Sequence, residues 1–123
     1  MLVVPVGGGG CIGGCAVAAK AINPRILVVG AEPVNADDAY RSLEAGKRIL
    51  LAGPPSTIAD GLRTSLGDLT FPIIKHNVDR IVRVTEKELI DSMVRCMWLR
   101  CTRDSFLSAV DVIYVVWSVW KLV

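Results

Sequence analysis

Four consecutive glycines, at positions 7–10, constrain this 123-residue chain more than any other feature. They follow an apolar, β-branched run at 2–6, which predicts a strand buried on both faces. A segment of small and apolar residues at 12–22 follows and predicts a helix that ends at Asn23-Pro24. A second apolar run at 25–30 predicts another strand. This order of strand, glycine loop, helix and strand favours an α/β fold with parallel strands.

The middle of the chain continues the alternation of helices and strands. Asn35 is the expected N-cap of a helix that runs through Ala45 and ends at Gly46. Residues 57–65 predict a short turn or helix. Residues 78–84 predict a third strand, so the chain predicts at least three strands for one sheet.

The C-terminal part predicts one more helix and then an apolar tail. Thr85, followed three positions later by Glu88, forms a capping-box pattern that opens a helix to about residue 100. The apolar run at 112–120 is much shorter than the ~20 residues that a membrane span needs. No basic segment at the start marks a signal peptide. We therefore expect no association with a membrane.

Charge and cysteine spacing exclude two other classes of function. The net charge is only +2 and the basic residues are scattered, so nucleic acid is not an expected partner. The four cysteines lack the close pairs of a zinc site, and the single histidine, His76, is far from them. We expect reduced thiols and a reducing, cytosolic (cytoplasmic) compartment. The cysteines are Cys11, Cys15, Cys96 and Cys101.

The glycine loop predicts a phosphate site. Without Cβ atoms, its backbone N–H groups can approach a ligand closely, and the following helix N-terminus adds a partial positive charge. Two classes of cofactor remain open at this point. The spacing Gly8-x-Gly10-x-x-Gly13 also matches the dinucleotide fingerprint, with Glu32 where a ribose-binding acid is expected. A domain that binds NAD(P) or FAD is therefore an alternative.

Five short segments, taken in order, narrow the choice of cofactor. Together they resemble the serine racemase/threonine (serine) dehydratase family of fold-type II pyridoxal-phosphate enzymes, over residues 2 to about 95. The segments are Val-Pro-Val-Gly-Gly-Gly-Gly at 4–10, Gly-Ala-Glu-Pro-Val-Asn-Ala-Asp-Asp at 30–38, Thr-Ile-Ala-Asp-Gly at 57–61, Phe-Pro-Ile-Ile at 71–74 and Val-Thr-Glu at 84–86.

The resemblance implies a fold and a division of the chain. It implies an α/β, parallel-sheet fragment of the large domain of a fold-type II enzyme, like the tryptophan synthase beta subunit. Residues 1–97 would be the C-terminal part of that domain, and residues 98–123 a divergent apolar tail without a counterpart in the family.

The resemblance also implies which residues bind pyridoxal 5′-phosphate. Gly61 would let the backbone approach the cofactor ring, although an ordinary helix-stop glycine is an equal alternative. The phosphate would be held by Gly7, Gly8, Gly9, Gly10 and the backbone of Cys11, where the family usually has leucine or methionine.

A divalent cation is the second group that the resemblance implies. Glu32, the backbone carbonyl of Ala36, and Asp38 would bind Mg²⁺, or Ca²⁺ or Mn²⁺ in its place. The chemistry fits, because these cations prefer oxygen ligands. The alternative is that Asp37 and Asp38 only complement the dipole of a helix whose first turn they occupy.

The implied reactions are racemisation of serine and dehydration of serine or threonine to an oxoacid and ammonia. They would make the parent enzyme an isomerase and lyase of amino-acid metabolism, and a homodimer. The family's catalytic lysine has no counterpart here, so we assign no catalytic residue and expect the chain alone to be inactive. A non-catalytic fragment that pairs with full-length subunits is a further alternative. The lysines without a matching motif are Lys20, Lys47, Lys75, Lys87 and Lys121.

Overall fold

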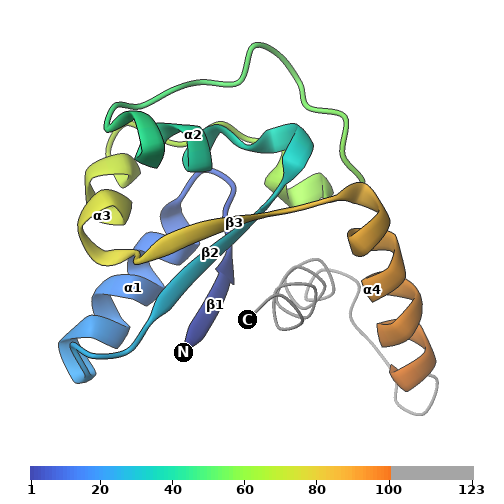
Figure 1. Ribbon diagram of the computed structural model, residues 1–123, viewed down its shortest axis with the longest axis horizontal. Coiled ribbons are helices and arrows are strands. Elements are labelled where there is room, and N and C mark those ends of the chain that lie inside the picture. Colours follow the sequence, from blue (N-terminus) through green and yellow to red (C-terminus); the bar gives the residue numbers. More distant parts are fainter. Residues whose placement is uncertain (101–123) are drawn as a thin grey trace.

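Three parallel strands form a single sheet in the order β1-β2-β3 (Figure 1). The computed structural model describes the backbone of residues 1–100 and the side chains of residues 1–94. The strands are β1 (Leu2–Pro5), β2 (Val28–Pro33) and β3 (Arg80–Val84). Both strand pairs are parallel, which confirms the predicted α/β fold.

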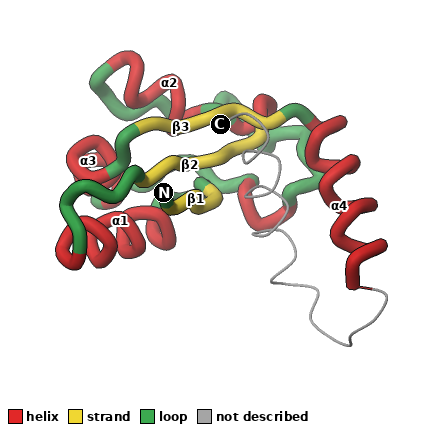
Figure 2. Tube along the Cα trace, turned by 60° about the horizontal axis from the view of Figure 1, so that its bottom comes forward, coloured by secondary structure: helices red, strands yellow, loops and turns green. Residues whose placement is uncertain are grey.

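Helices connect the strands and cover the sheet. They are α1 (Gly10–Ile22), α2 (Asp38–Ala45), α3 (Thr70–Asn77) and α4 (Glu86–Arg100), with 3₁₀ turns at Val34–Ala36 and Asp60–Leu62. Helices α1 and α3 lie side by side in both views, and α4 extends away from the sheet (Figure 2).

Each face of the sheet carries its own hydrophobic cluster, because successive side chains of a strand point to opposite faces. The first cluster joins the sheet to α1, α2 and α3, and it includes Val4, Ile12, Ala16, Val28, Ala39, Ile74 and Ile81. The second lies on the opposite face and consists of Val29, Ala31, Ala59, Leu62, Val84 and Leu89. The same alternation puts Glu32 on the face of the sheet that α2 covers.

Strand β2 begins three residues later than the predicted start of the second strand. The Ile26 N–H donates to the Asn23 carbonyl (3.0 Å), so residues 23–26 form a turn before β2. At its other end β2 extends to Pro33, which pairs with Val84 of β3. The prediction was wrong at both ends because pairing with other strands decides where β2 begins and ends: Val28 pairs with Leu2 of β1, and Pro33 with Val84 of β3.

The predicted N-cap of α2 was also wrong. Asn35 lies inside a 3₁₀ turn, and α2 begins only at Asp38. The Asn35 side-chain amide donates instead to the Ser56 carbonyl (2.7 Å), a contact between distant parts of the chain. The predicted end of α2 is confirmed, since Gly46 follows its last residue with φ 67°.

Helix α3 has no counterpart among the predicted elements. The apolar run that contains Pro72 does not suggest a helix, yet Pro72 is the third residue of α3. Proline is tolerated there because the first N–H groups of a helix have no partner within it. The preference of proline for the first turn of a helix was the one local feature that could have indicated α3.

The capping box at the start of α4 is confirmed. The Thr85 N–H donates to Glu88 Oε2 (2.8 Å), and the Glu88 N–H donates to Thr85 Oγ1 (3.3 Å). The predicted tail at 98–123 lies outside the described residues from position 101 onward. Within residues 1–100, the length and apolar character of every helix fall short of what crossing a membrane requires.

Candidate cofactor site

The glycine loop lies between β1 and α1, at the edge of the sheet where the parallel strands end. Gly9 occupies the N-cap position of α1 with φ 87°, and its carbonyl accepts the Gly13 N–H (3.0 Å). The N–H groups of Gly10, Cys11 and Ile12 come before this first helical bond and have no acceptor within α1. Three backbone donors at a helix N-terminus can bind an anion.

The loop is packed on one side and open on the other. A Cβ on Gly9 would lie 2.6 Å from Thr70 Oγ1 and 2.8 Å from the Cδ1 atoms of Ile74 and Leu66. A Cβ on Gly10, by contrast, would have no neighbour within 4 Å. Space for a ligand therefore exists beside Gly10, the first residue of α1.

Gly61 lies beside the glycine loop in space, although it is far from the loop in sequence. The Gly61 carbonyl oxygen lies 3.2 Å from the position of a Cβ on Gly7. Gly61 is the middle residue of the 3₁₀ turn at Asp60–Leu62, and no α-helix of the described chain ends there. The structure thus brings together the two segments for which the family resemblance implies a role in cofactor binding.

Hydrogen bonds from three directions fix the segment that carries Gly61. The Thr57 carbonyl accepts Arg63 Nη2 (2.8 Å), and the Ile58 N–H donates to Glu86 Oε2 (3.0 Å) at the start of α4. Upstream, the Ser56 carbonyl accepts the Asn35 amide. The segment therefore has a defined position beside Gly7.

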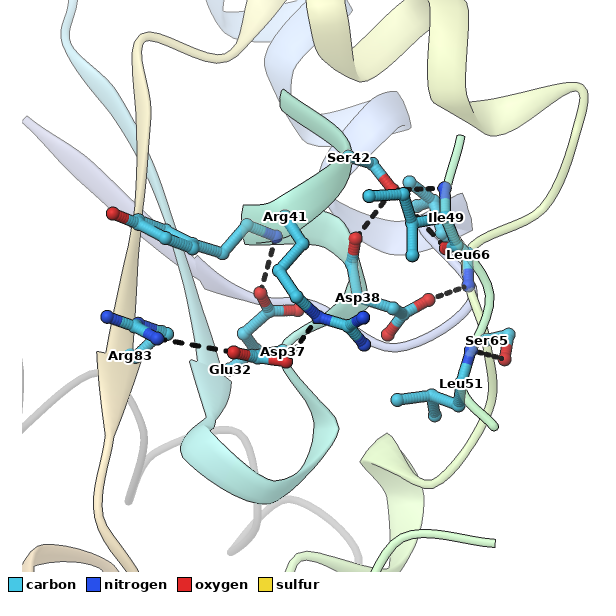
Figure 3. A network of polar contacts seen from close by, with 11 residues as sticks. Glu32, Asp37, Asp38, Arg41, Ser42, Ile49, Leu51, Ser65, Leu66 and Arg83 are labelled. Carbon is cyan, nitrogen blue, oxygen red and sulfur yellow. Dashed lines mark hydrogen bonds and ion pairs between the residues drawn. The ribbon is translucent and has the colours of Figure 1, made fainter. Parts of the chain in front are cut away.

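The three predicted metal ligands lie close together in sequence, Glu32 near the end of β2, Ala36 in the 3₁₀ turn that follows, and Asp38 at the start of α2. Glu32 is 1 % exposed, Ala36 2 % and Asp38 2 %. The Tyr40 N–H donates to Glu32 Oε1 (2.6 Å), and the Leu66 N–H donates to Asp38 Oδ2 (2.7 Å), as the polar network in Figure 3 shows. Both carboxylates are thus buried and held by backbone donors.

Burial makes the charged forms of Glu32 and Asp38 unfavourable. Burial raises the pKa of Glu32 to about 8, and the nearby charge of Asp38 adds to this effect. Burial also raises the pKa of Asp38. Asp37 instead pairs with Arg41 (2.7 Å) and Arg83 (3.3 Å). Within the described side chains neither Glu32 nor Asp38 forms an ion pair, and the charge of Arg41 only partly offsets the effect of burial on the pKa of Asp38. A divalent cation would favour the charged form of both carboxylates.

The donor set at this position is small. Among the described residues, no three side chains of histidine, cysteine, aspartate or glutamate are grouped so that they could hold a metal. A cation bound here would have to combine the carboxylates of Glu32 and Asp38 with a main-chain carbonyl such as that of Ala36, and water. Mg²⁺ commonly retains several waters in such sites.

The burial of Glu32 argues against a dinucleotide site. A ribose-binding acid must lie at the open end of its strand to reach the ribose hydroxyl. Glu32 is buried instead, and one of its oxygens is engaged by the Tyr40 N–H. This geometry does not suit the role that the dinucleotide alternative gives it.

Sequence reasoning missed the segment 66–70, which joins the loop to the carboxylates. Its Leu66 N–H is bound by Asp38, while the Gly67 N–H (3.1 Å) and the Thr70 hydroxyl (2.7 Å) both donate to the Gly8 carbonyl. We call residues 66–70 the latch segment. No local pattern could reveal it, because its partners lie far away along the chain.

The two described cysteines are free thiols on α1. Cys11 is exposed and Cys15 half-buried. Burial raises the pKa of Cys11, and the neighbouring Cys15 adds to the effect. The side chains of Cys96 and Cys101 lie outside the described residues.

A family model and several relatives match this chain. The family model, described as pyridoxal-phosphate dependent enzyme, matches residues 1–99. The serine racemase of Dictyostelium discoideum is 50% identical over 100 residues, which cover 80% of this chain and 31% of that protein. The serine racemase of Arabidopsis thaliana is 53% identical over 95 residues, which cover 77% and 28%.

Solved structures also match this chain. A threonine deaminase from T.th. superposes with a TM-score of 0.77 at 50% identity, over 83% of this chain and 36% of that one. The Dictyostelium discoideum serine racemase superposes with a TM-score of 0.76 at 40% identity, over 98% and 39%. The chain therefore spans about a third of the length of the relatives it matches.

Proposed function

Because the chain belongs to the pyridoxal-phosphate dependent enzyme family, we propose that its glycine loop holds the phosphate of pyridoxal 5′-phosphate. The supporting observation is the geometry at the start of α1. The N–H groups of Gly10 and Cys11 precede the first helical bond, and the space beside Gly10 is free. Charge-assisted hydrogen bonds from such donors suit a phosphate dianion.

Gly61 supports the same proposal from a second segment. Its turn packs against Gly7, so a cofactor held by the loop would lie near the backbone of the turn. A Cβ at position 7 would make tight contacts with that turn and the residues after it, at 3.2 Å from the Gly61 carbonyl oxygen and 3.2 Å from Thr64 Oγ1. The role of Gly7 and Gly61 is therefore to let two backbone segments approach each other around the cofactor.

The proposed parent reactions are racemisation of serine and dehydration of serine or threonine, in line with the names of the relatives. When bound, pyridoxal phosphate supplies an electron sink for charge that develops at the α-carbon of an amino acid. The residues of this chain contribute binding and orientation: they fix the phosphate and position the cofactor ring. The free thiols of Cys11 and Cys15 are compatible with a cytoplasmic enzyme.

Covalent anchoring of the cofactor is not among the roles that we propose for this chain. Three of its lysines have partners elsewhere: Lys20 bonds to Asp79, Lys75 to the Gly46 carbonyl and Lys87 to Asp91. We propose that the chain by itself binds the phosphate but does not turn over an amino acid.

A phosphate-dependent affinity for the cofactor is the first expected result. Pyridoxal 5′-phosphate should bind the purified chain at least about tenfold more tightly than pyridoxal, since one charge-assisted hydrogen bond is worth ~1.5–3 kcal/mol and ~1.4 kcal/mol is tenfold. Isothermal titration with the two compounds checks this, with pyridoxal as the matched control. Equal affinities would contradict the phosphate site. Release of pyruvate or D-serine from L-serine by the same sample would contradict the inactivity of the chain.

We further propose that Glu32, the Ala36 carbonyl and Asp38 bind Mg²⁺, with Ca²⁺ or Mn²⁺ as substitutes. The proposal is supported by two buried carboxylates, neither of which forms an ion pair among the described side chains. In this position a cation would hold the end of β2 against the start of α2. Its role would be structural, because Asp38 is bonded to the latch segment and not to the glycine loop itself.

A second candidate function is that of a non-catalytic partner of full-length subunits. It is favoured by the sheet, in which β1 and β3 each pair on one side only within the described residues. Strand β1 is apolar throughout, and unpaired edges of this kind can accept another strand. Co-expression with the homodimeric parent enzyme and capture through a tag on this chain would recover both. Recovery of the chain alone would exclude this candidate.

A further inference from the structure

We propose that Thr70 is a positioning residue that orients the Gly8–Gly9 peptide so that the Gly9 N–H faces the phosphate. This inference rests on the proposed phosphate site. Thr70 belongs to no motif that the sequence singles out, and it lies on α3, outside the glycine loop. Its effect on the ligand passes through the carbonyl of Gly8.

The Gly8 carbonyl has two donors, and both come from the latch segment. Thr70 Oγ1 donates to it at 2.7 Å, and the Gly67 N–H donates to it at 3.1 Å. The Thr70 hydroxyl also lies 3.2 Å from the Gly67 carbonyl. A hydroxyl has one proton, and the shorter contact identifies the Gly8 carbonyl as its principal acceptor.

Fixing this carbonyl also fixes the next N–H group. A trans peptide is planar, with its C=O and N–H pointing in opposite directions. All peptide bonds of the described chain are trans. With the Gly8 carbonyl held toward α3, the Gly9 N–H must point away from α3. Glycine on both sides of this peptide leaves few steric limits on its rotation, so the two donors supply the constraint.

The Thr70 hydroxyl can occupy its position only because residues 9 and 67 are glycines. A Cβ on Gly9 would lie 2.6 Å from Thr70 Oγ1, and a Cβ on Gly67 would lie 2.9 Å from it. The hydroxyl is therefore enclosed between two glycines. Gly9 itself is buried, which limits the access of water that could replace the bond. The hydrogen bond of Thr70 therefore requires glycine at positions 9 and 67.

The test compares Thr70→Val with Thr70→Ser in the full chain, with inorganic phosphate as the probe. Valine keeps the shape and removes the donor, whereas serine keeps the donor. Phosphate should bind about five- to tenfold more weakly to the valine variant, as expected for one lost hydrogen bond. Affinity in the serine variant should stay within about twofold of the original chain. The melting temperatures of the three chains without phosphate show whether a loss of affinity comes only from a loss of stability.

The outcomes distinguish this inference from the proposed function. If the unaltered chain does not bind phosphate, both fail. If it binds and Thr70→Val binds equally well, only the role of Thr70 fails, even where the variant melts at a lower temperature.

A second measurement uses the unaltered chain and does not depend on the folding of a variant. The amide resonance of Gly9 should shift on addition of phosphate. A Gly9 amide that does not respond, while those of Gly10 and Cys11 do, overturns the inference.

Discussion

Replacing Gly9 with alanine should destabilise the chain by roughly 2–5 kcal/mol and abolish measurable phosphate binding. Gly9 has φ 87°, a conformation that costs other residues ~1–2 kcal/mol. The added Cβ would also lie within 2.8 Å of Leu66 and Ile74 and 2.6 Å from Thr70. Forcing an extra carbon into such packing costs ~1–3 kcal/mol. Urea denaturation monitored by circular dichroism measures the loss.

Gly14→Ala is the matched control for this substitution. Gly14 lies within α1, and a Cβ there would have no neighbour within 4 Å. Alanine is favoured over glycine in a helix by about 0.5–1 kcal/mol, so this variant should be as stable as the original chain or more stable. Equal denaturation midpoints for Gly9→Ala and the original chain would show that the loop does not have the conformation described.

Replacing Glu32 with glutamine should stabilise the metal-free chain at high pH and remove its response to Mg²⁺. Burial raises the pKa of Glu32 from 4.5 to about 8, so the folded chain holds the proton more tightly than the unfolded chain does. Stability from this group is complete below pH 4.5 and is lost as the pH rises to about 8. At ~1.4 kcal/mol per pKa unit, the loss is on the order of 4–5 kcal/mol.

Glutamine resembles the protonated form and does not titrate. In chelator at pH 9, Glu32→Gln should therefore unfold at a higher denaturant concentration than the original chain, while the two should converge near pH 4. Mg²⁺ should restore stability at pH 9 only where Glu32 is present, because the cation favours the charged carboxylate. Glu44→Gln, an exposed change on α2, is the control. Parallel pH profiles would contradict the raised pKa of Glu32, and equal protection of both chains by Mg²⁺ would refute the cation site.

Local sequence pattern was sufficient for the elements that depend on neighbours along the chain. The apolar run before Gly7 and the glycines after it indicate a strand that turns into a helix, and β1 and α1 are found there. Thr85 and Glu88 lie within one helical turn, so their reciprocal bonds could be predicted. Gly46 ends α2 for the same local reason.

Other features depended on partners that the pattern does not contain. The ends of β2 follow from its pairing with β1 at Val28 and with β3 at Pro33. Asn35 lies in a 3₁₀ turn before α2, and its side-chain amide donates to the distant Ser56 carbonyl. Helix α3 was missed because an apolar run with Pro72 carries no clear helical signal until its place in the first turn is known. In each case packing against a distant segment overrides local preference.

The sequence by itself determined the parallel α/β arrangement, the position of the glycine loop and the family to which the chain belongs. Only the tertiary structure decided how the loop is held and how its neighbours are charged. It buried Glu32 without a positive partner among the described side chains and brought Gly61 against Gly7. It also joined Thr70 to the Gly8 carbonyl. The reason is physical: hydrogen bonds and burial depend on which segments meet after folding, whereas a sequence pattern reports only what is adjacent along the chain.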